Sequence, residues 1–123
     1  MKIGIYVDED NSEFRGTLYG DLIMAQLDAA ISKDKLAQNP DITGIEVLVF
    51  HPARSNATGE WDAVSELIDD NKKTLFYMMA IYAPERKLYF GNRKNLLYVG
   101  EGSDFFIDPA KHIVDNYREF VTI

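Results

Sequence analysis

Ile45-Glu46-Val47-Leu48-Val49-Phe50 is the stretch that decides the fold, because it is an almost unbroken apolar run between Gly44 and Pro52. Every second residue of this run is β-branched as far as Val49, which favours an extended strand over a helix. A strand that is apolar on both faces is typical of the centre of a sheet covered by helices on its two sides. The run therefore predicts a sheet with helices packed on it.

The residues before this run predict one strand and one helix. Ile3, Ile5 and Val7 alternate with less apolar residues, which is the period of a strand. From Asp21, a predicted N-cap, apolar residues recur at helical spacing until Asn39-Pro40 ends the segment. The residues on this predicted helical stripe are Leu22, Ile23, Leu27, Ala30 and Ile31.

The residues after the run predict a helix, three strands and a last helix. The first helix carries Trp61, Val64, Leu67 and Ile68 on one stripe. The apolar runs 75–83, 87–90 and 96–99 are separated by turn-forming residues 84–86 and 91–95, which predicts antiparallel hairpins. Asp108 as N-cap and Pro109 in the first turn start the last helix.

We therefore expect residues 1–123 to form a single small α/β domain with some α+β character. The expected order is β-α-β-α-β-β-β-α, in one mixed β-sheet with a parallel crossover, an antiparallel meander and helices packed on the sheet. An apolar strand 75–83 and aromatic-rich hairpins would leave a sheet face or edge for a homodimer.

Composition excludes several classes of function. The 123 residues contain 13 basic and 20 acidic side chains, a net charge of −7, and no cysteine. The negative charge disfavours duplex nucleic acid as a partner, and the missing thiols exclude disulfides and Cys-ligated metal sites. The sequence has no signal peptide and no apolar stretch long enough to insert into a membrane, so we expect a soluble cytoplasmic protein.

The loop at residues 51–59 is the predicted ligand-binding site. It leaves the end of the central strand and enters a helix N-terminus, where backbone amides and the helix dipole favour an anion. Arg54 can grip an anion with two hydrogen bonds, and the polar side chains around it can donate others. The predicted ligand-binding residues are His51, Arg54, Ser55, Asn56 and Thr58. In the alternative interpretation, Asn56 or Thr58 only caps the helix, and His51 and Arg54 face solvent.

A second candidate site is the acidic loop at residues 8–13. Asp8 and Asp10 are the predicted ligands of a Ca²⁺ or Mg²⁺ ion, because hard cations are bound by several oxygens. The spacing resembles the start of an EF-hand loop, but Glu13 replaces the turn glycine and Tyr19 the closing glutamate. The alternative is a solvated acidic loop with no cofactor.

Basic residues and aromatic residues also occur close together at residues 86–98. Arg86-Lys87 and Arg93-Lys94 flank Tyr89 and Phe90, a combination that can bind single-stranded nucleic acid or a nucleotide by charge and stacking. The alternative is that these charges protect a sheet edge and the rings pack on it. The sequence contains no arrangement of nucleophile and base that predicts catalysis, since His51 and His112 are its only histidines.

Residues 21–121 resemble the TPM-domain family in their order of elements. The resemblance is carried by the run 45–50, by the helix from Trp61, and by the stretch Tyr77 to Gly91, an arginine-bearing hairpin whose second strand ends at a glycine. It departs from the family at Asp70-Asn71-Lys72-Lys73, where members have a longer segment with glycine, and in having no membrane anchor. The resemblance implies a role in membrane-protein maintenance, with phosphatase activity and calcium binding suggested for some members. No catalytic residue carries over.

Three functional hypotheses follow. The first is a non-enzymatic binding module for a protein partner or a small anionic ligand, similar in character to inhibitors, immunity proteins or accessory proteins. The second is a metal-assisted phosphate-ester hydrolase, with Arg54, Ser55 and Asn56 on the phosphate and Asp8 and Asp10 on the metal. The third is a nucleotide or second-messenger binder that uses the 51–59 loop without turnover.

Overall fold

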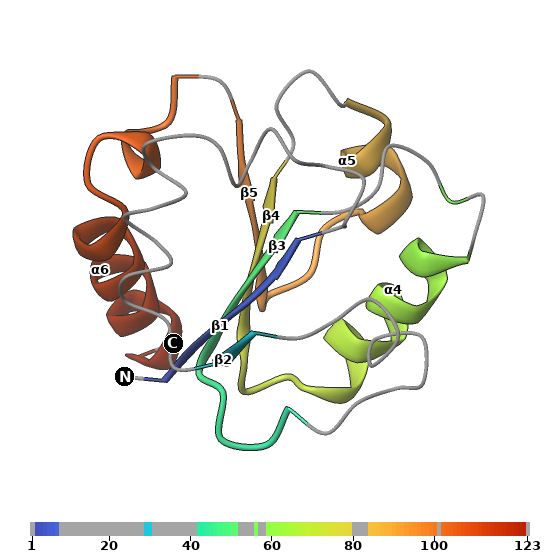
Figure 1. The fold of residues 1–123 in the computed structure, drawn as a ribbon, viewed down its shortest axis with the longest axis horizontal. Coiled ribbons are helices and arrows are strands. Elements are labelled where there is room, and N and C mark those ends of the chain that lie inside the picture. Colours follow the sequence, from blue (N-terminus) through green and yellow to red (C-terminus); the bar gives the residue numbers. More distant parts are fainter. Residues whose placement is uncertain are drawn as a thin grey trace.

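The chain folds around one sheet, seen in the computed structural model of Figure 1. The structure describes residues 2–7, 29–30, 42–51, 56, 59–79, 84–100 and 102–122. Its strands are β1 (Ile3–Val7), β2 (Ala29–Ala30), β3 (Val47–His51), β4 (Leu75–Met79) and β5 (Leu96–Val99). Its helices are α4 (Glu60–Asp70), α5 (Pro84–Phe90), the 3₁₀ helix η1 (Asp104–Phe106) and α6 (Pro109–Thr122).

All described strand pairs are parallel, and the strand order is β2-β1-β3-β4-β5. Parallel neighbours require a crossover between them, and helices α4 and α5 provide the crossovers on either side of β4. The predicted α/β class, with helices packed on a sheet, is confirmed. The predicted antiparallel meander is wrong, because β4 and β5 run in the same direction.

Helices cover both faces of the sheet (Figure 1). On one face, α6 packs through Ile113 against side chains of β3, β4 and β5 such as Val49, Tyr77 and Val99. On the other face, α4 packs through Trp61, Val64, Leu67 and Ile68, and α5 through Phe90. Covering both faces explains why the side chains of β4 and of residues 47–50 in β3 are all buried. The prediction that residues 45–50 contain a central strand buried on both faces is confirmed.

The largest correction concerns residues 84–90. The predicted turn at 84–86 and strand at 87–90 form helix α5, which starts at Pro84. Proline suits the first turn of a helix, since its missing N–H would have no partner inside the helix. Arg86 and Phe90 lie one helical turn apart, and both are buried. Because helix α5 carries the chain from the end of β4 back across the sheet, β5 lies parallel to β4 and not antiparallel to it.

A second correction concerns the predicted helix that begins at Asp21. Within it the structure describes only Ala29 and Ala30, and these form the short strand β2 beside β1. Pairing with Gly4 and Ile5, far away in the sequence, stabilises a strand that local spacing does not predict. The predicted start of the last helix is confirmed, since the Asp108 carboxylate accepts a hydrogen bond from the Lys111 amide at 3.2 Å.

The predicted homodimer depends on an exposed strand at residues 75–83. The described part of that strand, residues 75–79, is not exposed. Leu75 to Met79 lie between β3 and β5 with all side chains buried. The exposed large hydrophobic residues in the described part of the chain are Leu88, Tyr89, Ile107 and Val121. No helix in that part is long and apolar enough to cross a membrane.

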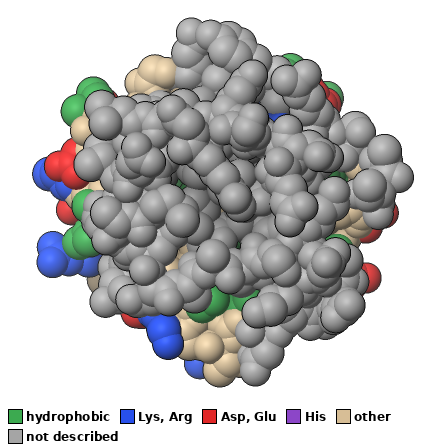
Figure 2. Space-filling view, in the orientation of Figure 1, with side chains coloured by type: hydrophobic (Ala, Val, Ile, Leu, Met, Phe, Trp, Pro, Cys, Tyr) green, Lys and Arg blue, Asp and Glu red, His purple; other side chains and the backbone are tan. Residues whose placement is uncertain are grey.

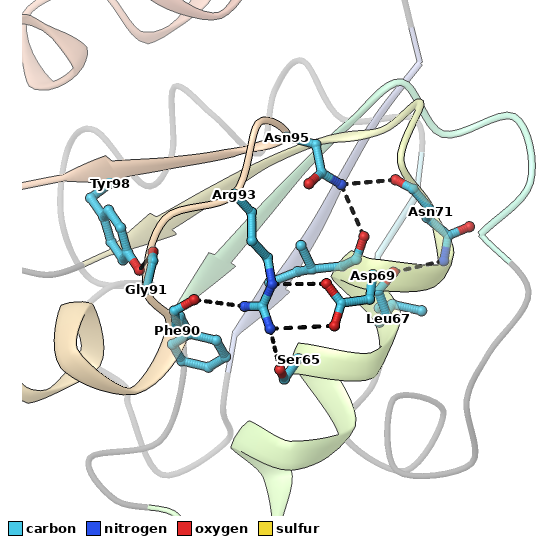
Figure 3. A network of polar contacts seen from close by, with 10 residues as sticks. Ser65, Leu67, Asp69, Asn71, Phe90, Gly91, Arg93, Asn95 and Tyr98 are labelled. Atoms are coloured by element: carbon cyan, nitrogen blue, oxygen red, sulfur yellow. Dashed lines mark hydrogen bonds and ion pairs between the residues drawn. The ribbon is translucent and has the colours of Figure 1, made fainter.

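The turn between α5 and β5 is fixed to the end of α4 by two side chains (Figure 3). The Arg93 guanidinium donates to Asp69 Oδ1 at 2.8 Å, to the Ser65 hydroxyl at 2.7 Å and to the Phe90 carbonyl at 2.8 Å. The buried Asn95 amide donates to the carbonyls of Ile68 at 2.9 Å and Asn71 at 3.1 Å. The Ile68 carbonyl also accepts from the Asn71 amide at 3.4 Å and the Asn71 carbonyl from the Thr74 amide at 3.0 Å, so Asn95 adds a second, side-chain donor to each.

Replacing Asn95 with Asp should lower the free energy of unfolding by about 2 kcal/mol, because a buried carboxylate cannot donate and would place its oxygens against the two carbonyls that the Asn95 amide contacts. The negative charge at a helix C-terminus adds to the loss. Chemical denaturation measures the change. Asn92→Asp, at an exposed position of the same turn, is the matched control and should change stability little. Equal losses in the two variants would contradict this role of Asn95.

A polar contact joins β4 to α6 on the face of the sheet that α6 covers. The hydroxyl of Tyr77 lies 3.0 Å from Nδ1 of His112 and donates to the His112 carbonyl at 3.2 Å. The Asn116 amide nitrogen donates to the His112 carbonyl at 2.8 Å and lies 3.2 Å from Nδ1. Burial lowers the pKa of His112, although the charges of Asp104 and Asp115 act in the opposite direction.

The free energy of unfolding should therefore fall as the pH drops from 7 to 5. The unfolded chain, with an ordinary histidine pKa near 6.5, binds a proton that the folded state resists, so acid favours unfolding. His112→Asn keeps a polar side chain at this position but does not titrate. Urea denaturation at the two pH values should show a smaller pH effect in this variant than in the wild type. An identical pH effect in both proteins would contradict the assignment.

Candidate ligand-binding edge of the sheet

The ends of β1 and β3 lie side by side at one edge of the sheet. Val7, the last residue of β1, is the register partner of His51, the last residue of β3. The chain passes from β1 to β2 on one side and returns to β3 on the other, so the strand order reverses between β1 and β3. In open parallel sheets, ligands bind at the carboxyl edge at such a reversal, because the connections there diverge and leave a crevice.

This edge is where both predicted sites begin. Asp8 directly follows Val7 in the sequence, and the 51–59 loop starts at His51. Most predicted site residues lie outside the described residues, namely Asp8, Asp10, Arg54, Ser55 and Thr58. His51 is placed by its backbone alone, as the end of β3. The structure thus brings together the starting points of the two predicted sites, which the hydrolase hypothesis combines.

Asn56 has a structural role in the loop. Its side-chain oxygen accepts a hydrogen bond from the Trp61 amide at 2.9 Å, and its carbonyl accepts one from the Gly59 amide at 3.1 Å. The first of these satisfies an amide in the first turn of α4 that has no partner within the helix. The capping interpretation of Asn56 is confirmed. Its role as a ligand donor stays a prediction.

Helices α4 and α5 follow β3 and β4 in the sequence, and the start of α4 lies beside the last turn of α5 (Figure 1). The first turn of α4 carries the carboxylates of Glu60 and Asp62, and that of α5 carries Glu85, so these acids offset the partial positive charge of the helix N-termini. The start of α4 is held against α5 by Trp61, whose ring centroid lies 5.3 Å from that of Tyr89 and 5.8 Å from that of Phe90.

Arg86 is a residue of this edge whose burial the sequence analysis missed. Its guanidinium donates to the Met79 carbonyl at 3.0 Å, at the end of β4, and only 5% of the residue is exposed. Met79 follows Met78, the register partner of Phe50 in β3. A positive charge is therefore buried next to the end of the central strand. The predicted strand at 87–90 gives no sign that Arg86 is buried. Pro84, taken as the start of a helix, would have indicated that burial.

The predicted cluster of basic and aromatic residues is divided by the structure. Arg86 lies at the carboxyl edge beside Met79, whereas Arg93 contacts Asp69 at the end of α4, at the opposite edge. The ammonium of Lys87 lies 5.7 Å from the centre of the Tyr98 ring, a cation–π contact. These residues therefore do not form one nucleotide site around the predicted hairpin.

The residues that the structure describes do not form a metal site. No group of three or more histidine, aspartate or glutamate side chains in that part of the chain is placed to hold an ion. The predicted ligands Asp8 and Asp10 are not among those residues, so Ca²⁺ or Mg²⁺ binding there stays a prediction.

Comparisons of the chain with protein-family models, with curated proteins and with solved structures found no match. The resemblance to the TPM-domain family therefore stays a hypothesis. One feature that carries it, the hairpin within the stretch from Tyr77 to Gly91, is helix α5 in the structure.

Proposed function

We propose that this protein is a binding module for a small anionic ligand of the phosphate class, held at the carboxyl edge of the sheet between β1 and β3. The observation that carries the proposal is the pairing of Val7 with His51 at the reversal of strand order. Arg54, Ser55 and Thr58 follow His51 within seven residues of sequence and supply a cation and two hydroxyl donors.

The Arg54 loop supplies the charge for an anion. The chain carries a net charge of −7, so Arg54, in the loop that leaves β3, would provide the positive charge for an anion at this edge. A small anion can lie close to this group, whereas a larger polyanion would also face the acidic residues of the chain. This favours a small ligand over nucleic acid.

The topology also favours a small ligand over a protein partner. A crevice at a reversal of strand order suits a ligand that is enclosed by loops on two sides. A protein partner would need an extended surface, and the exposed large hydrophobic residues of the described chain are scattered over α5, the turn after η1 and α6. A protein partner remains the alternative within the class of binding modules.

A metal-assisted phosphate-ester hydrolase is the second candidate, favoured by the same adjacency of Val7 and His51. It would combine a cation on Asp8 and Asp10 with a phosphate on the Arg54 loop. Release of nitrophenol from p-nitrophenyl phosphate with Mg²⁺, lost in Asp8→Asn, would favour the hydrolase. No release above the blank with Mg²⁺, Mn²⁺ or Ca²⁺ would favour the binding module.

Titration of ¹⁵N-labelled protein with inorganic phosphate at constant ionic strength tests the binding proposal. We expect saturable shifts of the amides of Val7, Gly59 and Glu60, which are described residues next to the proposed site. Arg54→Ala should weaken the affinity about tenfold, because a lost charge-assisted hydrogen bond costs about 1.4 kcal/mol or more.

Arg118→Ala is the matched control, since it removes the same charge from an exposed position on α6. It should leave the phosphate affinity unchanged. Absence of saturable shifts at Val7 and Gly59, or equal weakening by Arg54→Ala and Arg118→Ala, would contradict the proposed site.

A further inference from the structure

A second cleft lies at the opposite, amino edge of the sheet, away from the proposed phosphate site. It has a volume of about 760 Å³ and is formed by the turn before β4, the turn before β5 and the last turns of α6. Its described lining residues are Lys72, Lys73, Arg93, Lys94, Asn95, Tyr117, Phe120 and Val121. A cleft of this size matches the range of about 300–1,000 Å³ that small organic ligands occupy.

The described lining of this cleft carries four basic side chains and no acidic one. The whole chain has only 13 basic residues against 20 acidic ones, so this concentration opposes the average charge of the molecule. Figure 2 shows Lys and Arg side chains, in blue, at the left and lower left of the molecule. The excess of positive charge favours an anionic ligand.

The charges of the cleft differ in what they already contact. Arg93 is bound to Asp69, Ser65 and the Phe90 carbonyl, so it fixes the turn and is partly neutralised. Lys72, Lys73 and Lys94 are exposed, and no residue in the described part of the chain forms an ion pair with them. Their ammonium groups can therefore meet a phosphate without first breaking an ion pair with a described residue.

The other wall of the cleft is aromatic. The rings of Tyr117 and Phe120 lie 6.1 Å apart at an interplanar angle of 49°, and both side chains are half-buried against the core. Burial raises the pKa of the Tyr117 hydroxyl, and the nearby carboxylate of Glu46 acts in the same direction. Exposed aromatic faces on a rigid helix can stack a planar ring, and such stacking contributes about 1–3 kcal/mol per base in nucleic-acid complexes.

We propose that this cleft binds a small organic phosphate with a planar ring, of the nucleotide class. In this arrangement the phosphates lie against Lys72, Lys73 and Lys94, and the ring lies against Tyr117 and Phe120. A nucleic-acid strand fits less well, because it would extend beyond the cleft onto a surface of net negative charge. The proposal stands apart from the proposed phosphate site, since the two lie at opposite edges of the sheet.

The test uses ADP as the probe, with pyrophosphate as the charge-only and adenosine as the ring-only comparison. Titration of the ¹⁵N-labelled protein with ADP should shift the amides of residues 72–73, 94–97 and 117–121. ADP should bind at least about tenfold more tightly than either comparison compound, because only ADP uses both walls. The double variant Lys72→Gln/Lys94→Gln should weaken ADP binding about tenfold, because it removes two phosphate contacts.

Lys111→Gln is the matched control, because it removes an exposed lysine charge near the start of α6, away from the cleft. It should leave ADP affinity unchanged. Phe120→Leu should reduce the preference for ADP over pyrophosphate while keeping an apolar side chain. Equal weakening by the control, no shifts in the three segments, or tighter binding of a single-stranded oligonucleotide than of ADP would overturn the proposal.

Discussion

The common direction of β1, β3, β4 and β5 is the constraint on which the rest of the structure depends. Because these strands are parallel, each connection must cross the sheet, and a helix lies between β3 and β4 and another between β4 and β5. The same constraint places all carboxyl ends at one edge and all amino ends at the other. It also buries β3 and β4 on both faces, which explains the unbroken apolar sequence of residues 47–50.

The two edges have different chemistry as a consequence. The carboxyl edge holds the buried Arg86 beside Met79, and the sequences that leave β1 and β3 there are rich in polar residues. The amino edge receives the turns before β4 and β5, where the lysines gather against the last turns of α6. Arg93 and Asn95 fix one of these turns to α4, so the lysine-bearing side of the cleft is attached to a rigid element.

Much of the fold could be predicted from local sequence, and the errors have physical causes. Pro109 was recognised as a helix start because Asp108 precedes it and a long apolar stripe follows. Pro84 is the same signal, but the buried face of α5 consists of Arg86 and Phe90, and a buried arginine does not appear as an apolar position. Strand β2 depends on pairing with β1, which no local pattern contains.

The candidate site was predictable in its parts and not in their arrangement. The acidic loop after Val7 and the Arg54 loop after His51 were both identified from residue type, but only the register of β1 and β3 makes them neighbours. The cleft at the amino edge combines Lys72, Lys94 and Tyr117, which are separated by more than twenty residues each in the sequence, so spacing alone could not reveal it.

Cross-strand nuclear Overhauser effects test the direction of the strands most directly. The account predicts cross-peaks that join Val7 to His51 and Met79 to Val99. Strong Hα–Hα cross-peaks between residues 75–79 and 87–90, the mark of an antiparallel hairpin, would contradict it.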